Sequence, residues 1–213
     1  MAQDAVVLYG APFSVYVRIA RLALEEKGVP YDLEPVDIFA EEGPPPGYLA
    51  RHPFGRIPAF QHGTFQLYEA AAIARYVDEA FDGPALQPEA PPARARMNQI
   101  IGILDSYAYR TLVWDIYVAK RESGEEPSTE TLARGKTCLT ALQDLKGEQP
   151  WLAGEQLSLA DLHAAPIMVY ALMTPEGQTL LEDHSSLAAW WHVLARRDSL
   201  ARTRFPAEDG HDH

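Results

Sequence analysis

Ser14 is the first residue whose type and position could support chemistry. It follows a short apolar segment, residues 5–9, and opens a predicted helix that runs to Gly28. A hydroxyl in this place can donate a hydrogen bond to a thiolate, and the N-terminus of a helix adds backbone donors and positive potential. The thiolate is the nucleophilic form of a thiol, so this position suits thiol chemistry. Serine here is also a common helix cap, and the local sequence alone favours that structural interpretation.

Glu69 opens a later helix, in which Ile73, Val77 and Ala80 recur at helical spacing. A carboxylate at this end of a helix complements the helix dipole, which is its structural interpretation. That role leaves the carboxylate able to bind a cation as well.

A hairpin precedes this second helix. Residues 57–61 are apolar, and residues 65–68 alternate in polarity as a half-buried strand does. Between them, His62 and Gly63 occupy a turn that needs a residue tolerant of positive φ. Pro58 lies at the start of the first strand, where it cannot donate to a ladder, so its presence requires a special reason.

The elements that position these residues form an α/β unit. Residues 5–9 and 31–36 are predicted strands, and the helix between them predicts a parallel pair with a crossover connection. With the hairpin and its helix, the order is strand, helix, strand, loop, strand, strand, helix, which is the thioredoxin-like plan. Residues 40–47, AEEGPPPG, are too rich in proline for a helix and are predicted as the loop.

The chain changes character after this unit. We expect a thioredoxin-like domain at residues 1–81, a proline-rich linker at 82–92 and an all-helical domain at 93–213. The predicted helices of the last domain are residues 93–121, 128–146, 158–173 and 187–197. Ser158 and Asp161 form a capping signature, which assigns Asp161 to folding and not to catalysis.

Composition and charge argue against several classes of function. The net charge of −12 argues against nucleic acid or an anionic membrane surface as a partner. No apolar run is long enough to span a membrane and the N-terminus lacks the pattern of a signal peptide, so we expect a cytoplasmic protein. Cys138 is the sole cysteine, which precludes an intrachain disulfide and a cysteine cluster, and we expect no metal.

Residues 52–60, His-Pro-Phe-Gly-Arg-Ile-Pro-Ala-Phe, resemble a run found in a known family. Together with His-Gly at 62–63 and Glu-Ala at 69–70, they resemble the N-P-F-G-Q-V-P-A-F run, D-G turn and E-S pair of glutathione transferases. The resemblance is greatest to the serine-type phi branch and its bacterial relatives, and it extends to the capping signature at residues 158–161. It implies the glutathione transferase fold, a thioredoxin-like α/β domain followed by an all-α domain, with glutathione as co-substrate.

The resemblance also implies residue roles. Ser14 matches the catalytic serine that stabilises the glutathione thiolate, and Glu69 matches the glutamate that holds the γ-glutamyl ammonium. Pro58 matches a cis-proline, which would leave the backbone of Ile57 facing the bound peptide. Phe54 matches an aromatic residue near the subunit interface, so a homodimer is implied.

Three positions depart from the family pattern. Ala70 stands where a serine hydroxyl binds the γ-glutamyl carboxylate, and Arg56 replaces a glutamine. The His-Lys pair that grips the glycyl carboxylate should fall near Gly43 and Pro44, neither of which is basic. Arg56 could supply a carboxylate anchor, since a guanidinium fork suits carboxylates. The predicted glutathione-binding residues are Arg56, Ile57, Pro58, Glu69 and Ala70.

The long helix is expected to bind the electrophile. Tyr107, Arg110, Thr111 and Trp114 are spaced at i, i+3, i+4 and i+7 and would lie on one face of an α-helix. Core packing is the commoner explanation of such a stripe, but an aromatic face with one arginine also suits an aromatic electrophile. Phe13 is a further candidate wall of this electrophile site.

Two functions remain open on the sequence. The first is a detoxifying enzyme that activates the glutathione thiolate for attack on an apolar electrophile, by conjugation, dehalogenation, ether cleavage or peroxide reduction. The second is a non-catalytic protein of the same fold that binds a hydrophobic ligand or partner. Ser14, Ile57–Pro58 and Glu69 favour the enzyme, whereas Ala70 and residues 43–46 favour the binding protein.

Overall fold

The computed structural model describes residues 4–208 of the 213-residue chain. The chain divides into two compact units. The first unit runs to Pro84 and also takes in Ala201–Pro206, and the second comprises Ala85–Leu200 and the residues from Ala207 onward. No pattern in the sequence indicates that Ala201–Pro206 belongs with the first unit.

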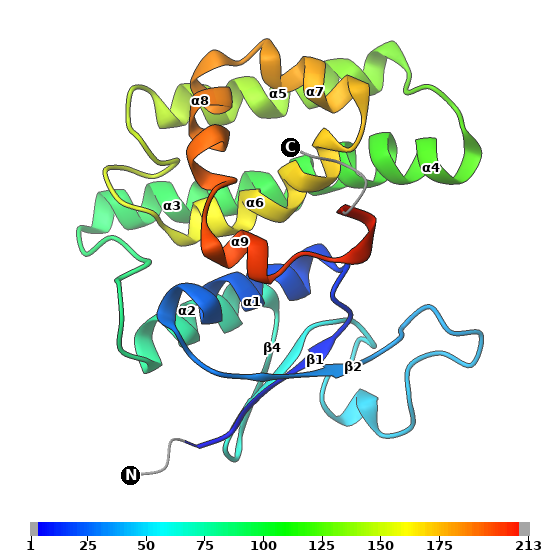
Figure 1. Cartoon of the computed structure of the whole chain (residues 1–213), viewed down its shortest axis with the longest axis vertical. Coiled ribbons are helices and arrows are strands. Elements are labelled where there is room, and N and C mark those ends of the chain that lie inside the picture. The colour runs from blue at the N-terminus through cyan, green and yellow to red at the C-terminus, as the bar shows by residue number, and fades with distance from the viewer. Residues whose placement is uncertain (1–3, 209–213) are drawn as a thin grey trace. The chain divides into compact units, whose positions relative to one another are not determined.

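A four-stranded sheet forms the base of the first unit (Figure 1). Its strands are β1 (Val6–Gly10), β2 (Asp32–Pro35), β3 (Ala59–His62) and β4 (Phe65–Tyr68), in the spatial order β2-β1-β3-β4. β1 is parallel to β2 and antiparallel to β3, and β3 is antiparallel to β4. The predicted thioredoxin-like order of elements is therefore confirmed.

Two helices lie on the same face of this sheet (Figure 1). α1 (Val15–Lys27) follows β1, and α2 (Ala70–Ala80) follows β4. α1 is capped at its start by Ser14 and at its end by Gly28, whose φ of 66° suits glycine, as the sequence predicts. The apolar side chains of the sheet and the two helices that are almost fully buried include Leu8, Val17, Leu22, Phe60, Ile73 and Val77.

α1 also holds the C-terminal segment of the first unit. The buried Arg18 donates through Nε to Thr203 Oγ1 at 3.2 Å, and its guanidinium lies 5.7 Å from the centre of the Phe205 ring. Arg21 donates to the carbonyl oxygens of Thr203 and Arg202 at 3.0 and 3.2 Å. The hydrogen bond between Arg18 and Thr203 joins residues 185 positions apart, so no local pattern could predict it.

Helices make up the second unit. The helices that follow α2 along the chain are α3 (Pro91–Ile103), η2 (Leu104–Val118), α4 (Ala119–Ser123), α5 (Thr129–Lys146), α6 (Leu159–Leu172), α7 (Pro175–Glu182), α8 (Ser185–Leu194), α9 (Asp198–Arg202) and the short η3 (Pro206–Glu208). The helix predicted over residues 93–121 corresponds to α3, η2 and α4 in direct succession. Its middle part, η2, is a π-helix, which is wound with i→i+5 hydrogen bonds. α7, α9 and η3 were not predicted.

Every residue of α6 is buried, and its first turn is fixed by Asp161. The Asp161 carboxylate accepts hydrogen bonds from the Ser158 N–H at 2.8 Å, the Leu152 N–H at 2.9 Å and Trp190 Nε1 at 2.8 Å. Burial raises the pKa of the Asp161 carboxyl, and these hydrogen bonds act against that shift. The predicted capping signature is confirmed, so Asp161 serves the fold.

Candidate functional site

The register of the sheet brings three predicted site segments to one edge of the first unit. Tyr9, near the end of β1, pairs with Ala59 at the start of β3, and Ala59 pairs with Tyr68 at the end of β4. The start of α1, the turn before β3 and the start of α2 therefore meet at this edge. The predicted residues in these three segments are Ser14, Ile57, Pro58, Glu69 and Ala70.

Ser14 is the N-cap of α1. Its backbone is extended, with φ of −69° and ψ of 127°, and its Oγ accepts a hydrogen bond from the Val17 N–H at 3.4 Å. The structural interpretation of Ser14 is therefore confirmed. A hydroxyl oxygen that accepts one hydrogen bond still has its own proton to donate. Because the residue is only half-buried, Ser14 can cap the helix and donate to an incoming anion at the same time.

The turn before β3 presents backbone groups at the same edge. The Ile57–Pro58 peptide bond is cis, which confirms the prediction from the family resemblance. Within residues 4–208, neither the N–H nor the carbonyl of Ile57 has a backbone hydrogen-bond partner. A peptide ligand could therefore pair with both groups, as an added strand pairs with a sheet edge.

Tyr48 holds this turn in place. It lies in η1 (Tyr48–Ala50), is buried, and donates from Oη to the backbone carbonyl of Arg56 at 2.8 Å. Burial raises the pKa of Tyr48 to about 12, so the phenol keeps its donor proton at neutral pH. No motif in the sequence marks Tyr48 as a residue of the site. The only available signal was an aromatic side chain directly after a proline-rich loop.

Glu69 has a backbone conformation that residues with side chains rarely adopt. Its φ is 74° and its ψ is 112°, and it is the one non-glycine residue with positive φ in the described part of the chain. Such a conformation costs about 1–3 kcal/mol and is concentrated at functional sites. The Glu69 side chain is exposed and does not cap α2 by a hydrogen bond, so its carboxylate is available to a cation.

A buried imidazole and an exposed guanidinium are electrostatic neighbours of this glutamate. Burial lowers the pKa of His52, the negative charge of Glu69 raises it, and the positive charge of Arg56 lowers it. The His52 ring lies 4.8 Å from the Tyr68 ring, and its Nδ1 has no hydrogen-bond partner among the described residues. Arg56 is exposed, so its guanidinium is accessible to a carboxylate. In the sequence, His52 stands out only as a member of the run at residues 52–60.

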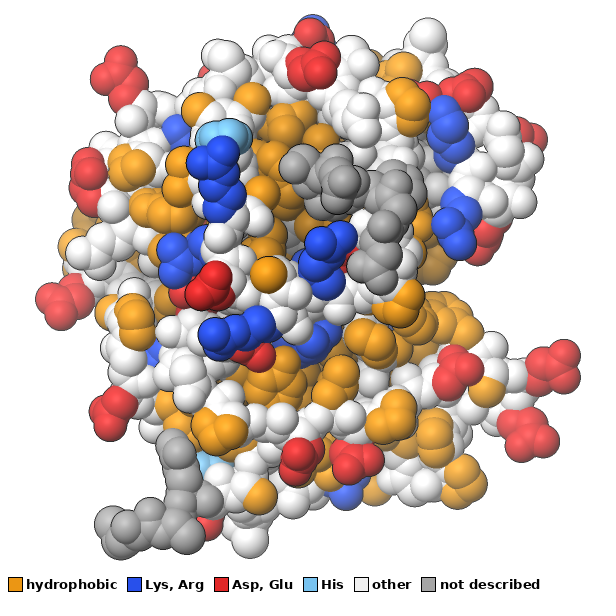
Figure 2. All heavy atoms as spheres, in the orientation of Figure 1, with side chains coloured by type: hydrophobic (Ala, Val, Ile, Leu, Met, Phe, Trp, Pro, Cys, Tyr) orange, Lys and Arg blue, Asp and Glu red, His pale blue; other side chains and the backbone are white. Residues whose placement is uncertain are grey.

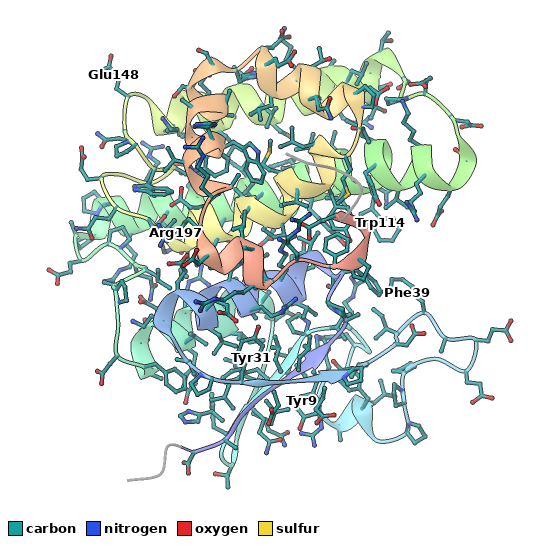
Figure 3. The ribbon with its side chains drawn as sticks, viewed as in Figure 1. Tyr9, Tyr31, Phe39, Trp114, Glu148 and Arg197 are labelled. Carbon is teal, nitrogen blue, oxygen red and sulfur yellow. The ribbon has the colours of Figure 1, made fainter. Side chains whose placement is uncertain are left out.

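The loop after β2 borders the same edge of the sheet, because β2 runs parallel to β1. Residues 37–47 contain no lysine, arginine or histidine, and they include the exposed Glu41 and Glu42. Figure 2 shows acidic side chains at the tip of this loop, and Figure 3 labels Phe39, an exposed apolar residue on it. A glycyl carboxylate would therefore meet no cation from this segment.

The four positions predicted as one face of the long helix do not all share an exposed face. Tyr107 is 62% exposed and Trp114 is 36% exposed, whereas Thr111 is 5% exposed. Four buried positions of η2 form a row at every fourth residue, namely Leu104, Ala108, Leu112 and Ile116, and Thr111 and Val113 are buried as well. Thr111 lies beside this buried row, which corrects the prediction for that residue. Burial of Thr111 beside that row agrees with core packing, the commoner explanation of such a stripe.

Phe13 directly precedes Ser14 and is exposed in the first unit. Its position beside Ser14, just before α1, is compatible with the predicted wall, which stays a prediction.

Within residues 4–208, no group of three or more His, Cys, Asp or Glu side chains is arranged to hold a metal ion. None of the described helices combines the length and the apolar character needed to cross a membrane.

Comparison with known proteins gives the family. The models for the N-terminal and C-terminal domains of glutathione S-transferases match residues 8–85 and 108–198. Glutathione S-transferase 4 of Zea mays is 32% identical over 92% of this chain and 91% of its own length, and glutathione S-transferase F9 of Arabidopsis thaliana is 30% identical over 94% and 98%. The solved structure of glutathione transferase F2 from Populus trichocarpa matches with a TM-score of 0.82 and 28% identity, over 93% of this chain and 96% of that chain. A glutathione S-transferase-I bound with lactoylglutathione matches with a TM-score of 0.81 and 28% identity, over 93% and 98%. This chain therefore belongs to the glutathione S-transferase family.

Proposed function

We propose that this protein is a glutathione transferase that activates the glutathione thiol and transfers it to an apolar electrophile. One observation carries the proposal, namely that three complementary groups meet at one edge of the sheet. The helix start at Ser14 suits a thiolate, the open backbone of Ile57 suits a peptide, and the exposed carboxylate of Glu69 suits an ammonium. Glutathione carries these three features together.

Ser14 is proposed as the residue that acts on the sulfur. A free thiol with a pKa of about 8.5 is mostly protonated at neutral pH. A hydrogen bond from Ser14 Oγ and the positive end of the α1 dipole both favour the thiolate. The thiolate then attacks an electrophilic carbon, the carbon–sulfur bond forms, and the leaving group departs with its electron pair.

The carboxylates of glutathione have weaker anchors than the family pattern supplies. Ala70 has no hydroxyl, so its backbone N–H at the start of α2 is the proposed partner of the γ-glutamyl carboxylate. Arg56 is the proposed cation for a carboxylate, because it is exposed at the turn that Tyr48 holds.

We further propose a cytoplasmic homodimer. Phe54 is 69% exposed and packs edge-on against Tyr68, with ring centres 6.3 Å apart, which leaves an apolar surface for a second copy of the chain. A monomer at micromolar concentration in light scattering would contradict this proposal.

Two simple measurements test the proposed activity. The protein should be retained on immobilised glutathione, and it should then consume thiol in the presence of a chlorodinitrobenzene electrophile. If the protein is retained on glutathione but consumes no thiol, the second candidate, a non-catalytic binding protein, is favoured. The missing hydroxyl at Ala70 and the acidic loop at residues 37–47 are the features that support this second candidate. If the protein is not retained on glutathione and does not consume thiol, the proposed activity is refuted.

A further inference from the structure

His52 is a buried imidazole beside the predicted glutathione residues of the first unit. It is 2% exposed, and within residues 4–208 its Nδ1 has no hydrogen-bond partner. Its ring lies 4.8 Å from the ring of Tyr68 and 6.1 Å from the ring of Phe54, measured between ring centres. Buried polar atoms are nearly always hydrogen-bonded in folded proteins, so an unused nitrogen requires an explanation. The two aromatic rings hold the imidazole in place without using that nitrogen.

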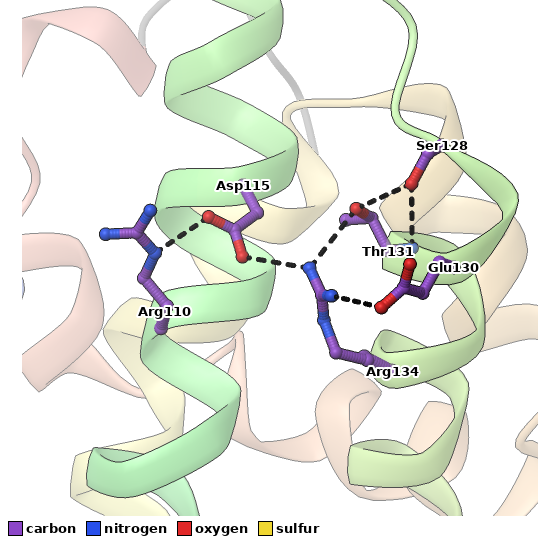
Figure 4. A network of polar contacts seen from close by, with 6 residues as sticks. All are labelled: Arg110, Asp115, Ser128, Glu130, Thr131 and Arg134. Atoms are coloured by element: carbon purple, nitrogen blue, oxygen red, sulfur yellow. Dashed lines mark hydrogen bonds and ion pairs between the residues drawn. The ribbon is translucent and has the colours of Figure 1, made fainter.

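Glu69 supplies a carboxylate that is also unpaired. It directly follows Tyr68 in the chain, and its negative charge acts on the imidazole. Among the described residues, the Glu69 side chain takes part in no hydrogen bond or ion pair. The polar network of the second unit is a contrast, because there Asp115 accepts from Arg110 at 2.8 Å and from Arg134 at 3.3 Å (Figure 4). Glu69 is therefore a free carboxylate with a titratable base beside it.

Two charged side chains influence the protonation of His52. Burial lowers the pKa of His52, the negative charge of Glu69 raises it, and the positive charge of Arg56 lowers it. The guanidinium of the adjacent Arg51 is instead stacked on an aromatic ring of β1. The Tyr68 ring that packs on the imidazole carries a phenol, which is neutral near neutral pH. His52 is therefore neutral at pH 7 and gains a positive charge in acid.

We propose that His52 is a pH-sensitive positioning residue, which leaves Glu69 free for the γ-glutamyl ammonium when it is neutral and competes for Glu69 when it is protonated. The proposal rests on the proposed transferase function and names a regulation of its glutathione site. A neutral imidazole forms no ion pair, so Glu69 keeps its full negative charge for the ligand. A protonated imidazole offsets part of that charge and repels the ammonium. Acid should therefore weaken the binding of a γ-glutamyl peptide.

The test uses S-methylglutathione, because the free thiol of glutathione would itself titrate on the protein as the pH changes. The methylated peptide keeps the γ-glutamyl ammonium and both carboxylates, whose charges are nearly constant between about pH 5 and pH 7. The measured quantity is its Kd, from calorimetric titration at each pH. In the wild-type protein, we expect the Kd at pH 5 to be about three- to fivefold higher than at pH 7, which is the upper range for one pair of partly exposed charges.

His52→Asn separates this role from a structural one. The family run carries asparagine at this position, so the variant should fold, and His52→Gln serves the same comparison if it does not. At pH 7 the variant should bind S-methylglutathione as the wild type does. At pH 5 it should bind about three- to fivefold more tightly than the wild type, because its side chain gains no charge. Damage to the fold would instead weaken binding at both pH values.

His62→Asn is the matched control. His62 belongs to β3 of the same unit, and its Nδ1 lies 2.8 Å from Tyr76 Oη. The substitution removes a second titratable imidazole at the end of β3 away from Ala59, which marks the site edge. This variant should therefore keep the pH dependence of the wild type.

Three results would overturn the proposal. The first is a wild-type Kd that does not rise at pH 5, and the second is an equal rise in His52→Asn. The third is a rise that varies with protein concentration and accompanies a lower mass in light scattering, which would assign the effect to an interface between copies. Failure of the wild-type protein to bind S-methylglutathione at pH 7 would overturn the proposed function as well, and so differs from these three results.

Discussion

Replacement of Ser14 separates the two roles that the structure gives to this residue. In the folded protein Ser14 Oγ caps α1 by accepting from the Val17 N–H at 3.4 Å. In the proposed reaction the same oxygen donates its proton to the glutathione sulfur. Alanine removes both functions. Glycine removes the hydroxyl but remains an acceptable N-cap, costing a few tenths of a kcal/mol relative to serine, whereas alanine costs about 0.5–2 kcal/mol.

The expected magnitudes follow from the two contacts. The capping hydrogen bond is long, so the loss of stability in Ser14→Ala should fall near the lower end of that range. A hydrogen bond to a charged group contributes about 1.5–3 kcal/mol, and one pKa unit corresponds to about 1.36 kcal/mol. Loss of the Ser14 hydroxyl should therefore raise the pKa of the bound thiol by roughly one to two units. Below that pKa, conjugation should slow by about ten- to a hundredfold.

The assay is the pH dependence of kcat/KM for the electrophile at saturating glutathione, together with urea unfolding of each variant. The rising limb should move to higher pH by the same amount in Ser14→Ala and Ser14→Gly, although the two variants differ in stability. Ser14→Thr, which keeps the hydroxyl, should resemble the wild type. If Ser14→Gly turns over like the wild type and only Ser14→Ala is impaired, the residue is a helix cap and the catalytic assignment fails.

Three other predictions concern the glutathione site. Ala70→Ser should tighten glutathione binding in calorimetric titration by about ten- to a hundredfold, through a hydroxyl bonded to the γ-glutamyl carboxylate, and Arg56→Gln should weaken it. If Ala70→Ser leaves the glutathione affinity unchanged and Arg56→Gln abolishes binding, the carboxylate anchor lies on Arg56. Tyr48→Phe should lower the free energy of unfolding by about 1–2 kcal/mol and weaken glutathione binding severalfold. The control is Tyr31→Phe, which loses a 3.0 Å hydrogen bond from Arg21 and should affect stability alone. The pKa of His52 is lower in the folded protein than in the unfolded chain. As pH falls below about 6.5, the unfolded chain therefore binds a proton at His52 before the folded protein does, and the free energy of unfolding decreases. His52→Asn should flatten that loss, and an unchanged pH profile of unfolding would contradict the assignment.

The first unit could be predicted from the sequence because its signals are local. Strand polarity, the caps Ser14 and Gly28, and the turn at Gly63, whose φ is 56°, each act within a few residues. Once the hairpin and the crossover are placed, strand pairing brings the ends of β1, β3 and β4 together. The meeting of these segments therefore follows from the strand order, whereas the roles expected of their residues came from the family resemblance.

The remaining features depend on interactions that local patterns do not encode. The hydrogen bonds of Arg18 and Arg21 to the segment around Thr203 span most of the chain. Thr111 was grouped with the exposed Tyr107 and Trp114 because helical spacing alone does not show which residues of a stripe pack against neighbouring helices. Tyr48 acts through one hydroxyl on a backbone carbonyl, and no periodicity reveals such a contact.

The departures from the family pattern are confined to side chains, and this limits what they can change. Ala70 and the loop at residues 37–47 remove side-chain partners of the glutathione carboxylates. The groups proposed to hold the peptide and the sulfur belong mainly to the backbone. They are the N–H and carbonyl of Ile57, which have no backbone partner within residues 4–208, and the helix N-terminus at Ser14. The strained backbone of Glu69 also persists without the neighbouring serine. These substitutions should therefore weaken the affinity for glutathione and leave the activation of its sulfur intact, so that a high glutathione concentration restores turnover.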